Sequence, residues 1–183
     1  MFDALLVLSF GGPNGPDDVL PFLRNVTAGR NVPDRRLAVV AEQYQQFDGK
    51  SPINDQNRAL IGAIEREFSD FGINLPVYFG NRNWEPFLAD TVQQMAHDGV
   101  GNALVLATSA FSSYSGCRQY REDLEIASAA VGDRAPGLHK LRLYYNHPGF
   151  VDAVVDRVRE TMQAGDRLVF TAHSLPVTMA ARC

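Results

Sequence analysis

The chain has 183 residues, of which 45% are hydrophobic and 21% charged, and its 17 basic and 21 acidic side chains give a net charge of −4. This is the composition of an ordinary globular protein, and it excludes the disordered and collagen-like classes. The basic residues are scattered, so the sequence lacks the positive patch that a nucleic-acid-binding protein needs. No apolar run approaches the roughly 20 residues of a membrane-spanning helix. Its two cysteines, without a recognisable export signal, favour reduced thiols and a cytoplasmic protein.

Strand-like runs rich in apolar residues recur along the whole chain. In chain order they are Ala4–Phe10, Leu75–Gly80, Ala103–Ser109, Lys140–Tyr145 and Leu168–Ala172. Their apolar residues are nearly continuous and do not alternate strictly with polar ones. That pattern is typical of parallel strands covered on both faces of the sheet.

Segments with helical spacing separate these strands. Apolar stripes at 37–47 and 60–68 predict two helices, and a third over about 147–163 predicts the last one. Pro33 and Pro86 are expected near helix starts, and Gly72 and Gly99 just after helix ends. Strand and helix alternate, so the sequence predicts an α/β fold: a doubly wound, three-layer domain built on a parallel sheet.

Ligands of such folds bind beyond the carboxyl ends of the strands, so the residues that follow each strand are the candidates for function. Gly11 and Gly12 follow the first strand, either as a tight turn or as backbone that lets a ligand approach closely. His173 follows the fifth strand, either as a hydrogen-bonded structural residue or as a proton acceptor or metal ligand.

The loops after the second and third strands also have two interpretations. Around Trp84, Arg82 could pair with Glu85 in a structural loop, or the loop could face a ligand. The stretch 108–120 mixes hydroxyl and aromatic side chains. Such a mixture suits either a hydroxyl-capped helix start or a pocket for a flat aromatic molecule with polar edges.

Five motifs, taken in order, resemble those of the ferrochelatases: LSFGGP at 8–13, GKSPIN at 49–54, YFGNRNWEPF at 78–87, FSSYSGCRQY at 111–120 and FTAHSLP at 170–176. The resemblance implies a lyase of heme biosynthesis that inserts Fe²⁺ into a porphyrin, with coproporphyrin III favoured over protoporphyrin IX. It implies two similar Rossmann-like domains. We therefore expect residues 1–146 to form the first domain, and 147–183 to be the crossover helix and first strand of a truncated second domain. On this view the missing half of the chain completes the enzyme, and the isolated segment is inactive.

The same resemblance assigns roles to individual residues. His173 corresponds to the histidine that accepts pyrrole protons or handles the metal. Phe10 stands where some relatives carry a tyrosine close to the metal, and a phenyl ring has no atom to donate to it. Arg30, Ser51 and Tyr120 lie in segments that hold the substrate's propionates, although Arg30 could equally be a solvated loop charge and Ser51 a turn residue.

Actinobacterial relatives that this sequence resembles also carry a [2Fe–2S] cluster bound by cysteines. Cys183 is our preferred candidate ligand, ahead of Cys117, and a free cysteine is the alternative. Two other functions remain open at this stage. One is a flavodoxin-like module that binds a flat cofactor or an anion without chemistry, and the other is a different tetrapyrrole metal chelatase.

Overall fold

The computed structural model describes residues 1–172, 174 and 177. Within them four parallel strands form one sheet in the order β2-β1-β3-β4. The strands are β1 (Ala4–Ser9), β2 (Val77–Asn81), β3 (Asn102–Ala107) and β4 (Gly137–Lys140). The predicted α/β fold with a parallel sheet is confirmed.

Six α-helices and three short helical turns connect or follow the strands in the described part of the chain. The α-helices are α1 (Val19–Val26), α2 (Asp34–Gln45), α3 (Ile53–Asp70), α4 (Leu88–His97), α5 (Gln119–Val131) and α6 (Pro148–Thr161). The short turns are η1 (Pro16–Asp18), η2 (Tyr114–Arg118) and η3 (Gly132–Arg134). None of the described helices is both long enough and apolar enough to cross a membrane.

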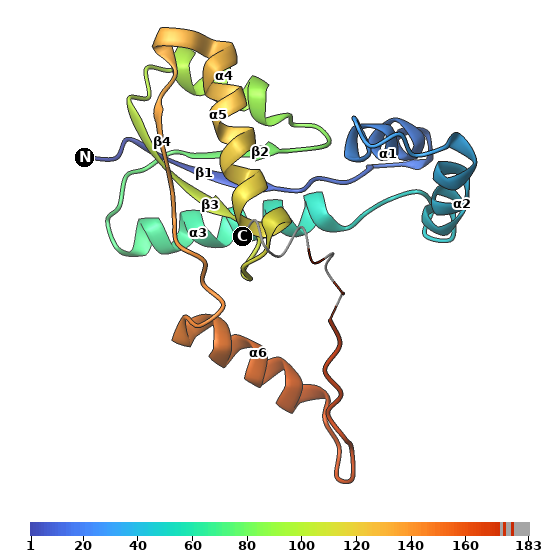
Figure 1. The fold of residues 1–183 in the computed structure, drawn as a ribbon. Helices are drawn as coiled ribbons and strands as arrows, with labels where there is room; N and C mark the ends of the chain where they lie inside the picture. Colours follow the sequence, from blue (N-terminus) through green and yellow to red (C-terminus); the bar gives the residue numbers. More distant parts are fainter. Residues whose placement is uncertain (173, 175–176, 178–183) are drawn as a thin grey trace. The chain divides into compact units, whose positions relative to one another are not determined.

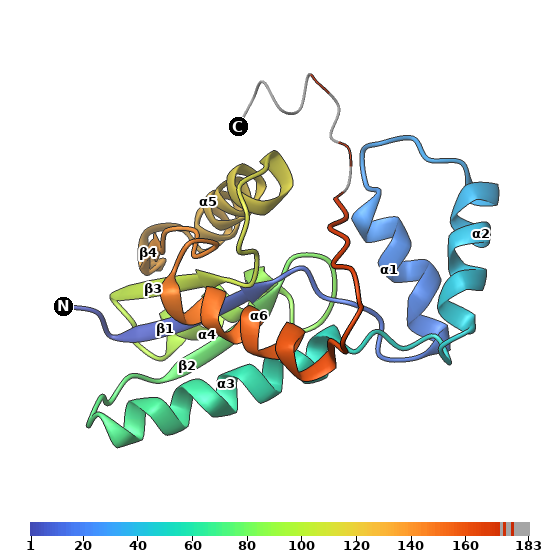
Figure 2. The same cartoon turned by 90° about the horizontal axis from the view of Figure 1, so that it is seen from below.

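The described chain divides into two compact units. The first comprises residues 1–108 and 123–141 and contains the whole sheet. In Figure 1, α3 runs below the strands, α4 lies above them, and α1 and α2 lie beyond the carboxyl end of β1. The same helices are seen from below in Figure 2. Residues 109–122 and those from 142 onward form the second unit.

β1 is the centre of the first unit. It pairs with β2 on one side and β3 on the other, and all six of its residues are buried. Leu6, Val7 and Leu8 are completely inaccessible to solvent. A strand hydrogen-bonded on both edges and packed on both faces can expose only its ends, so Phe10 is the first residue of this segment to reach the surface.

A smaller apolar cluster holds α1 and α2 together next to the sheet. Its buried members are Val19, Phe22, Leu23 and Leu37. Phe22 makes edge-to-face contacts with Phe10, Tyr44 and Trp84, at ring-centroid distances of 6.2, 6.1 and 6.3 Å. Aromatic rings prefer this geometry, so the cluster fixes the two helices against the loops that follow β1 and β2.

Two predicted strands differ from the structure. The fourth strand occupies Gly137–Lys140 and not Lys140–Tyr145, because pairing with β3 ends where the Leu141 N–H donates to the Val105 carbonyl. The run Leu168–Ala172 forms no strand, and Val169 and Phe170 are 78% and 88% exposed. A strand needs a hydrogen-bonded neighbour, and the described residues provide none beside this run.

The predicted helix boundaries agree more closely with the structure. Gly72 and Gly99 follow α3 and α4 with φ of +65° and +78°, the left-handed conformation expected after a helix end. Pro33 is the N-cap of α2, whereas Pro86 precedes α4 by two residues. The last helix begins after His147, whose Nδ1 accepts a hydrogen bond from the Gly149 N–H.

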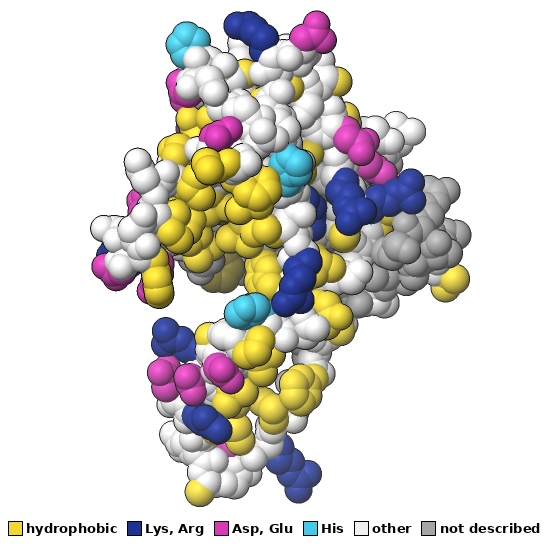
Figure 3. Space-filling view, turned by 90° about the vertical axis from the view of Figure 1, so that its left-hand side faces the viewer, with side chains coloured by type: hydrophobic (Ala, Val, Ile, Leu, Met, Phe, Trp, Pro, Cys, Tyr) yellow, Lys and Arg dark blue, Asp and Glu magenta, His cyan; other side chains and the backbone are white. Residues whose placement is uncertain are grey.

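In the second unit, α6 and its C-cap residue Met162 expose part of an apolar stripe: Val151, Val154, Val155 and Met162 are 36–48% exposed. Figure 3 shows hydrophobic side chains among charged ones on this helix. Phe150 is held within its own unit by ring contacts with Phe111 and Tyr144.

The buried central strand gives a direct test of the fold. Replacing the fully buried Leu6 by alanine should lower the free energy of unfolding by about 2–5 kcal/mol, because truncation of the side chain creates a cavity in the core. Leu60→Ala is the matched control, since Leu60 is 40% exposed on α3 and its loss should cost less than about 1 kcal/mol. Urea unfolding followed by circular dichroism measures both, and equal effects would contradict the placement of β1.

Candidate functional site

The loops that follow β1 and β2 meet the start of α3, and these three segments build the candidate site. The Ser51 N–H donates to the Pro13 carbonyl at 2.9 Å, and Asn14 and Lys50 form an isolated antiparallel bridge. A Cβ on Gly12 would lie 2.6 Å from the Ser51 Cβ. Only glycine fits at this position, because any larger residue would overlap the Ser51 side chain.

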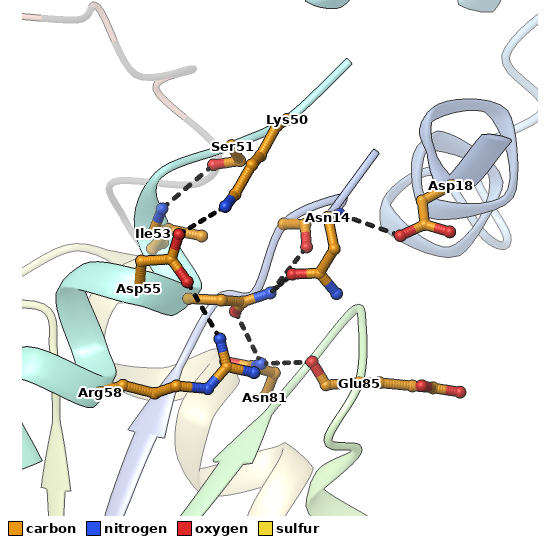
Figure 4. Close-up of polar contacts among 11 residues, drawn as sticks. Asn14, Asp18, Lys50, Ser51, Ile53, Asp55, Arg58, Asn81 and Glu85 are labelled. Carbon is orange, nitrogen blue, oxygen red and sulfur yellow. Dashed lines mark hydrogen bonds and ion pairs between the residues drawn. The ribbon is translucent and has the colours of Figure 1, made fainter. Parts of the chain in front are cut away.

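Buried amides tie the same three segments together (Figure 4). The Asn54 Nδ2 donates to the Gly12 carbonyl and to the Asn14 Oδ1, both at 2.9 Å. The Asn81 Nδ2 donates to the Asn54 Oδ1 at 3.1 Å and to the Glu85 carbonyl at 3.0 Å. Asn54 and Asn81 are 1% and 0% exposed. Burying an amide costs free energy that hydrogen bonds offset, so these bonds favour one arrangement of the loops.

Phe10 is held by the loop that follows β2. Its carbonyl accepts hydrogen bonds from the N–H and the Nδ2 of Asn83, at 3.2 and 3.0 Å. The Arg82 guanidinium lies 5.6 Å from the centroid of its ring, within the range of a cation–π interaction. With Phe22 as a further neighbour and 37% of its surface exposed, Phe10 is a fixed aromatic surface that a ligand can reach.

Arg82 forms its ion pair with Asp123 of α5 and not with Glu85. The pairing with Glu85, which belonged to one of the two alternative interpretations of this loop, is therefore wrong. The two side chains are 11% and 21% exposed, which makes this the most buried of the ion pairs found among the described residues. Sequence spacing favoured Glu85, because Glu85 is only three residues from Arg82. In the structure the Glu85 backbone carbonyl accepts a hydrogen bond from the Asn81 amide. Trp84 is fixed in the same loop, because its Nε1 donates to Asp18 and its ring contacts Phe22 and Phe87.

A pocket of about 450 Å³ lies beside Ser51. It is lined by Gln43, Tyr44, Phe47, Lys50, Ser51 and Pro52. Its walls are mainly aromatic and aliphatic, with an ammonium and a hydroxyl among them, and its volume falls within the range of small-molecule sites. Burial raises the pKa of the Tyr44 phenol, so this group stays protonated and can donate a hydrogen bond at neutral pH.

The structure brings together some of the predicted site residues. Phe10 and Ser51 lie in adjoining segments, and Phe22 contacts both Phe10 and the pocket residue Tyr44. Arg30 is exposed on the loop between α1 and α2. Tyr120 is 4% exposed on α5 and belongs to the second unit. His173 and Cys183 lie outside the described residues.

The segment before α5 provides a hydroxyl-capped helix start, one of the two predicted alternatives. The Ser113 Oγ accepts a hydrogen bond from the Gly116 N–H at 2.8 Å and caps η2. The Tyr114 hydroxyl donates to Glu122 at 2.9 Å. Cys117 lies in this turn as a free, partly buried thiol. No group of three or more His, Cys, Asp or Glu side chains within the described ranges could hold a metal ion.

A parallel sheet whose strands are connected by helices defines the doubly wound α/β class of proteins. The ligand-sized pocket lies between the end of α2 and the start of α3. The profile of the ferrochelatase family matches residues 2–183 of this chain, and the chain belongs to that family.

Curated relatives are similar over nearly the whole chain. The coproporphyrin III ferrochelatases of Streptomyces griseus and Frankia alni are 54% and 59% identical to it, over 98% and 97% of its length. A ferrochelatase of Rhodopirellula baltica is 51% identical over 100% of it. These matches cover 50%, 47% and 54% of the respective relatives, so the chain spans about half the length of the curated relatives it matches.

The acidic residue next to the pocket gives a test of the local geometry. Asp55 bonds to the Lys50 Nζ at 2.6 Å and to Arg58 at 3.2 Å, and the hydrogen bond from Lys50 is the main cause that lowers its pKa. Lys50→Met should raise that pKa toward its ordinary value, and Arg58→Met should raise it less. NMR titration of the Asp55 carboxyl measures both.

The sign of the associated pH dependence follows from the lowered pKa. The folded-state pKa lies below the unfolded one, so the contribution of this pair to stability is present at neutral pH and is lost as the pH falls through the folded-state value. Both side chains are half exposed, so salt should weaken the effect. An unchanged titration of Asp55 in Lys50→Met would contradict the geometry.

Proposed function

We propose that this chain is the N-terminal half of a ferrochelatase that inserts Fe²⁺ into coproporphyrin III. The observation that carries the proposal is the mainly apolar pocket beside Ser51, in a chain that belongs to the ferrochelatase family and has relatives named coproporphyrin III ferrochelatase. A porphyrin is a flat aromatic ring with carboxylate tails. It would find apolar walls together with a hydroxyl and an ammonium group here.

The proposed reaction exchanges two protons for one metal ion. Two pyrrole N–H bonds break, their protons leave, and Fe²⁺ binds the four ring nitrogens without any change of oxidation state. We assign proton acceptance or metal handling to His173, since a neutral imidazole accepts protons near pH 7. Phe10 would supply an apolar contact to the ring, and Arg30, Ser51 and Tyr120 would bind propionates.

The division of the chain into domains is part of the same proposal. Residues 1–146 would form the first of two similar domains, and 147–183 would lead into the second. All four strands of the sheet among the described residues lie before residue 141, which supports this boundary, whereas residues 109–122 group with those from 142 onward. A cleft built from two such domains would be incomplete in the 183-residue segment, so we expect the isolated segment to lack activity.

Metal insertion into coproporphyrin III tests the proposed function directly. In the full-length protein that contains this sequence, His173→Ala should lower kcat by about 10²–10⁴-fold, the usual contribution of a general base, and leave the porphyrin Kd nearly unchanged. His97→Ala is the matched control, because that side chain is exposed in the last turn of α4 and should be silent.

Anaerobic visible absorption with Fe²⁺ follows the metallation, and protoporphyrin IX run in parallel ranks the two substrates. A full-length protein that binds the porphyrin without metallating it would support the flavodoxin-like binding module instead. Preference for another metal ion over Fe²⁺ would indicate a different chelatase. Turnover by the 183-residue segment alone would contradict the proposal that both domains are needed to form the site.

The [2Fe–2S] cluster cannot be held by this chain alone. A cluster of this type is bound by four ligands, usually four cysteine thiolates, and the sequence contains two cysteines. The described thiol, that of Cys117, has no second cysteine and no metal-binding cluster near it within the described residues. We propose that Cys183 is one ligand of a cluster completed by cysteines outside this sequence.

The cluster proposal is tested by the spectrum of the full-length protein, purified without oxygen. Visible absorption between about 300 and 600 nm, together with iron and sulfide content, should be lost in Cys183→Ser and retained in Cys117→Ser. A colourless wild-type protein, or a Cys183→Ser variant that keeps its iron and sulfide, would refute the assignment.

A further inference from the structure

Asn54 occupies an unusual position on its helix. α3 is a surface helix whose apolar residues are only partly buried, and its two buried residues are both asparagines, Asn54 and Asn57. A buried amide is normally unfavourable on a helix face, because asparagine has low helix propensity and its polar atoms lose contact with water. A specific hydrogen-bond partner offsets this cost, and Asn54 has three of them.

The partners of Asn54 all lie outside its own helix. Its two N–H groups are used by the Gly12 carbonyl and the Asn14 Oδ1, and its Oδ1 accepts from Asn81. One side chain thus joins the start of α3 to the loop after β1 and to the end of β2 (Figure 4). These partners are 42, 40 and 27 residues away in sequence, so the bonds fix tertiary geometry and not local conformation.

The segments that Asn54 joins carry the residues proposed to contact the substrate. Ser51 lies three residues before it, and Phe10 lies two residues before its partner Gly12. The loop after β1 and the segment before α3 are in close contact. A Cβ on Gly12 would overlap Ser51, and a Cβ on Gly49 would lie 2.4 Å from the Pro16 Cα. A small movement of α3 relative to β1 would therefore change the distance between Phe10 and the pocket that Ser51 lines.

We propose that Asn54 is a positioning residue of the porphyrin site: the hydrogen bonds of its amide fix the distance between the pocket at Ser51 and the aromatic surface of Phe10. The inference rests on the proposed function. It predicts that loss of the amide weakens binding of the porphyrin, because the two contacts no longer fit one rigid ligand, and that chemistry at His173 is affected less.

Asn57 provides a matched control on the same helix. It lies one turn further along α3, is 5% exposed, and its Nδ2 has no hydrogen-bond partner among the described residues. Replacing either asparagine by leucine removes its amide, and it enlarges the side chain by the same amount at both positions. Only Asn54→Leu removes hydrogen bonds that connect the loops, so a difference between the two variants reports positioning and not packing.

The experiment measures metallation kinetics and amide exchange in the full-length protein, with coproporphyrin III as the probe. Asn54→Leu should raise KM for the porphyrin by about tenfold or more, the loss expected when a buried donor and acceptor lose their partners, with kcat within about threefold of wild type. Exchange of the Ser51 amide, which donates to Pro13, should accelerate. Asn57→Leu should change neither quantity by more than about twofold.

A double-mutant cycle separates positioning from general destabilisation. If Asn54 acts through Ser51, Asn54→Leu should add little to the KM of a Ser51→Ala protein, and the two effects should not be additive. If Asn54→Leu does not fold, Asn14→Ala serves instead. It removes one acceptor of the Asn54 amide from an exposed residue and should raise KM by about twofold to fivefold.

The inference is overturned if Asn54→Leu folds with an unchanged KM, if Asn57→Leu raises KM equally, or if the cycle is additive. Failure of the proposed function is a separate result, because it would be seen as absence of metallation by the wild-type protein. In that case the Ser51 amide exchange alone decides whether Asn54 holds the loops, and unchanged exchange in Asn54→Leu refutes it.

Discussion

The pairing of β1 on both edges is the constraint on which the rest of the first unit depends. Its six residues are buried between β2 and β3, so the strand has no freedom to shift without breaking two ladders of hydrogen bonds. Because the strands are parallel, β1 and β2 both deliver their loops to one edge of the sheet. The loop of Phe10 and the loop of Arg82 therefore meet there, and the start of α3 closes against them.

The sequence predicted the features that depend on local pattern. Apolar runs revealed β1, β2 and β3, and glycine placement gave the ends of α3 and α4, because these signals reside within a few neighbouring residues. The predicted fourth strand differs from β4 by several residues. The run GLHKLRLYY is compatible with a strand along its whole length, and only its pairing with β3 determines where the strand ends. The resemblance to ferrochelatases came from motifs in order, and the match over residues 2–183 confirms it.

The site was less predictable, for a physical reason. Asn54 lies in the polar run SPINDQN, where hydrophobic periodicity gives no sign of burial, and its partners are 27 to 42 residues away. Asp123 is 41 positions from Arg82, and nothing local favours it over Glu85. A buried polar contact between distant segments depends on the finished fold. The one available signal was indirect: Gly12 and Asn54 belong to two of the motifs that resemble the family.

Trp84 has a consequence for how this protein can be observed. It is the only tryptophan in the 183 residues, and its indole is fixed by Asp18 and packed against Phe22, which in turn contacts Phe10. Porphyrins absorb strongly at wavelengths where indoles emit. Under the proposed function, a porphyrin bound against Phe10 would therefore quench Trp84 by resonance energy transfer, and the fluorescence of this one indole would report binding without an added label.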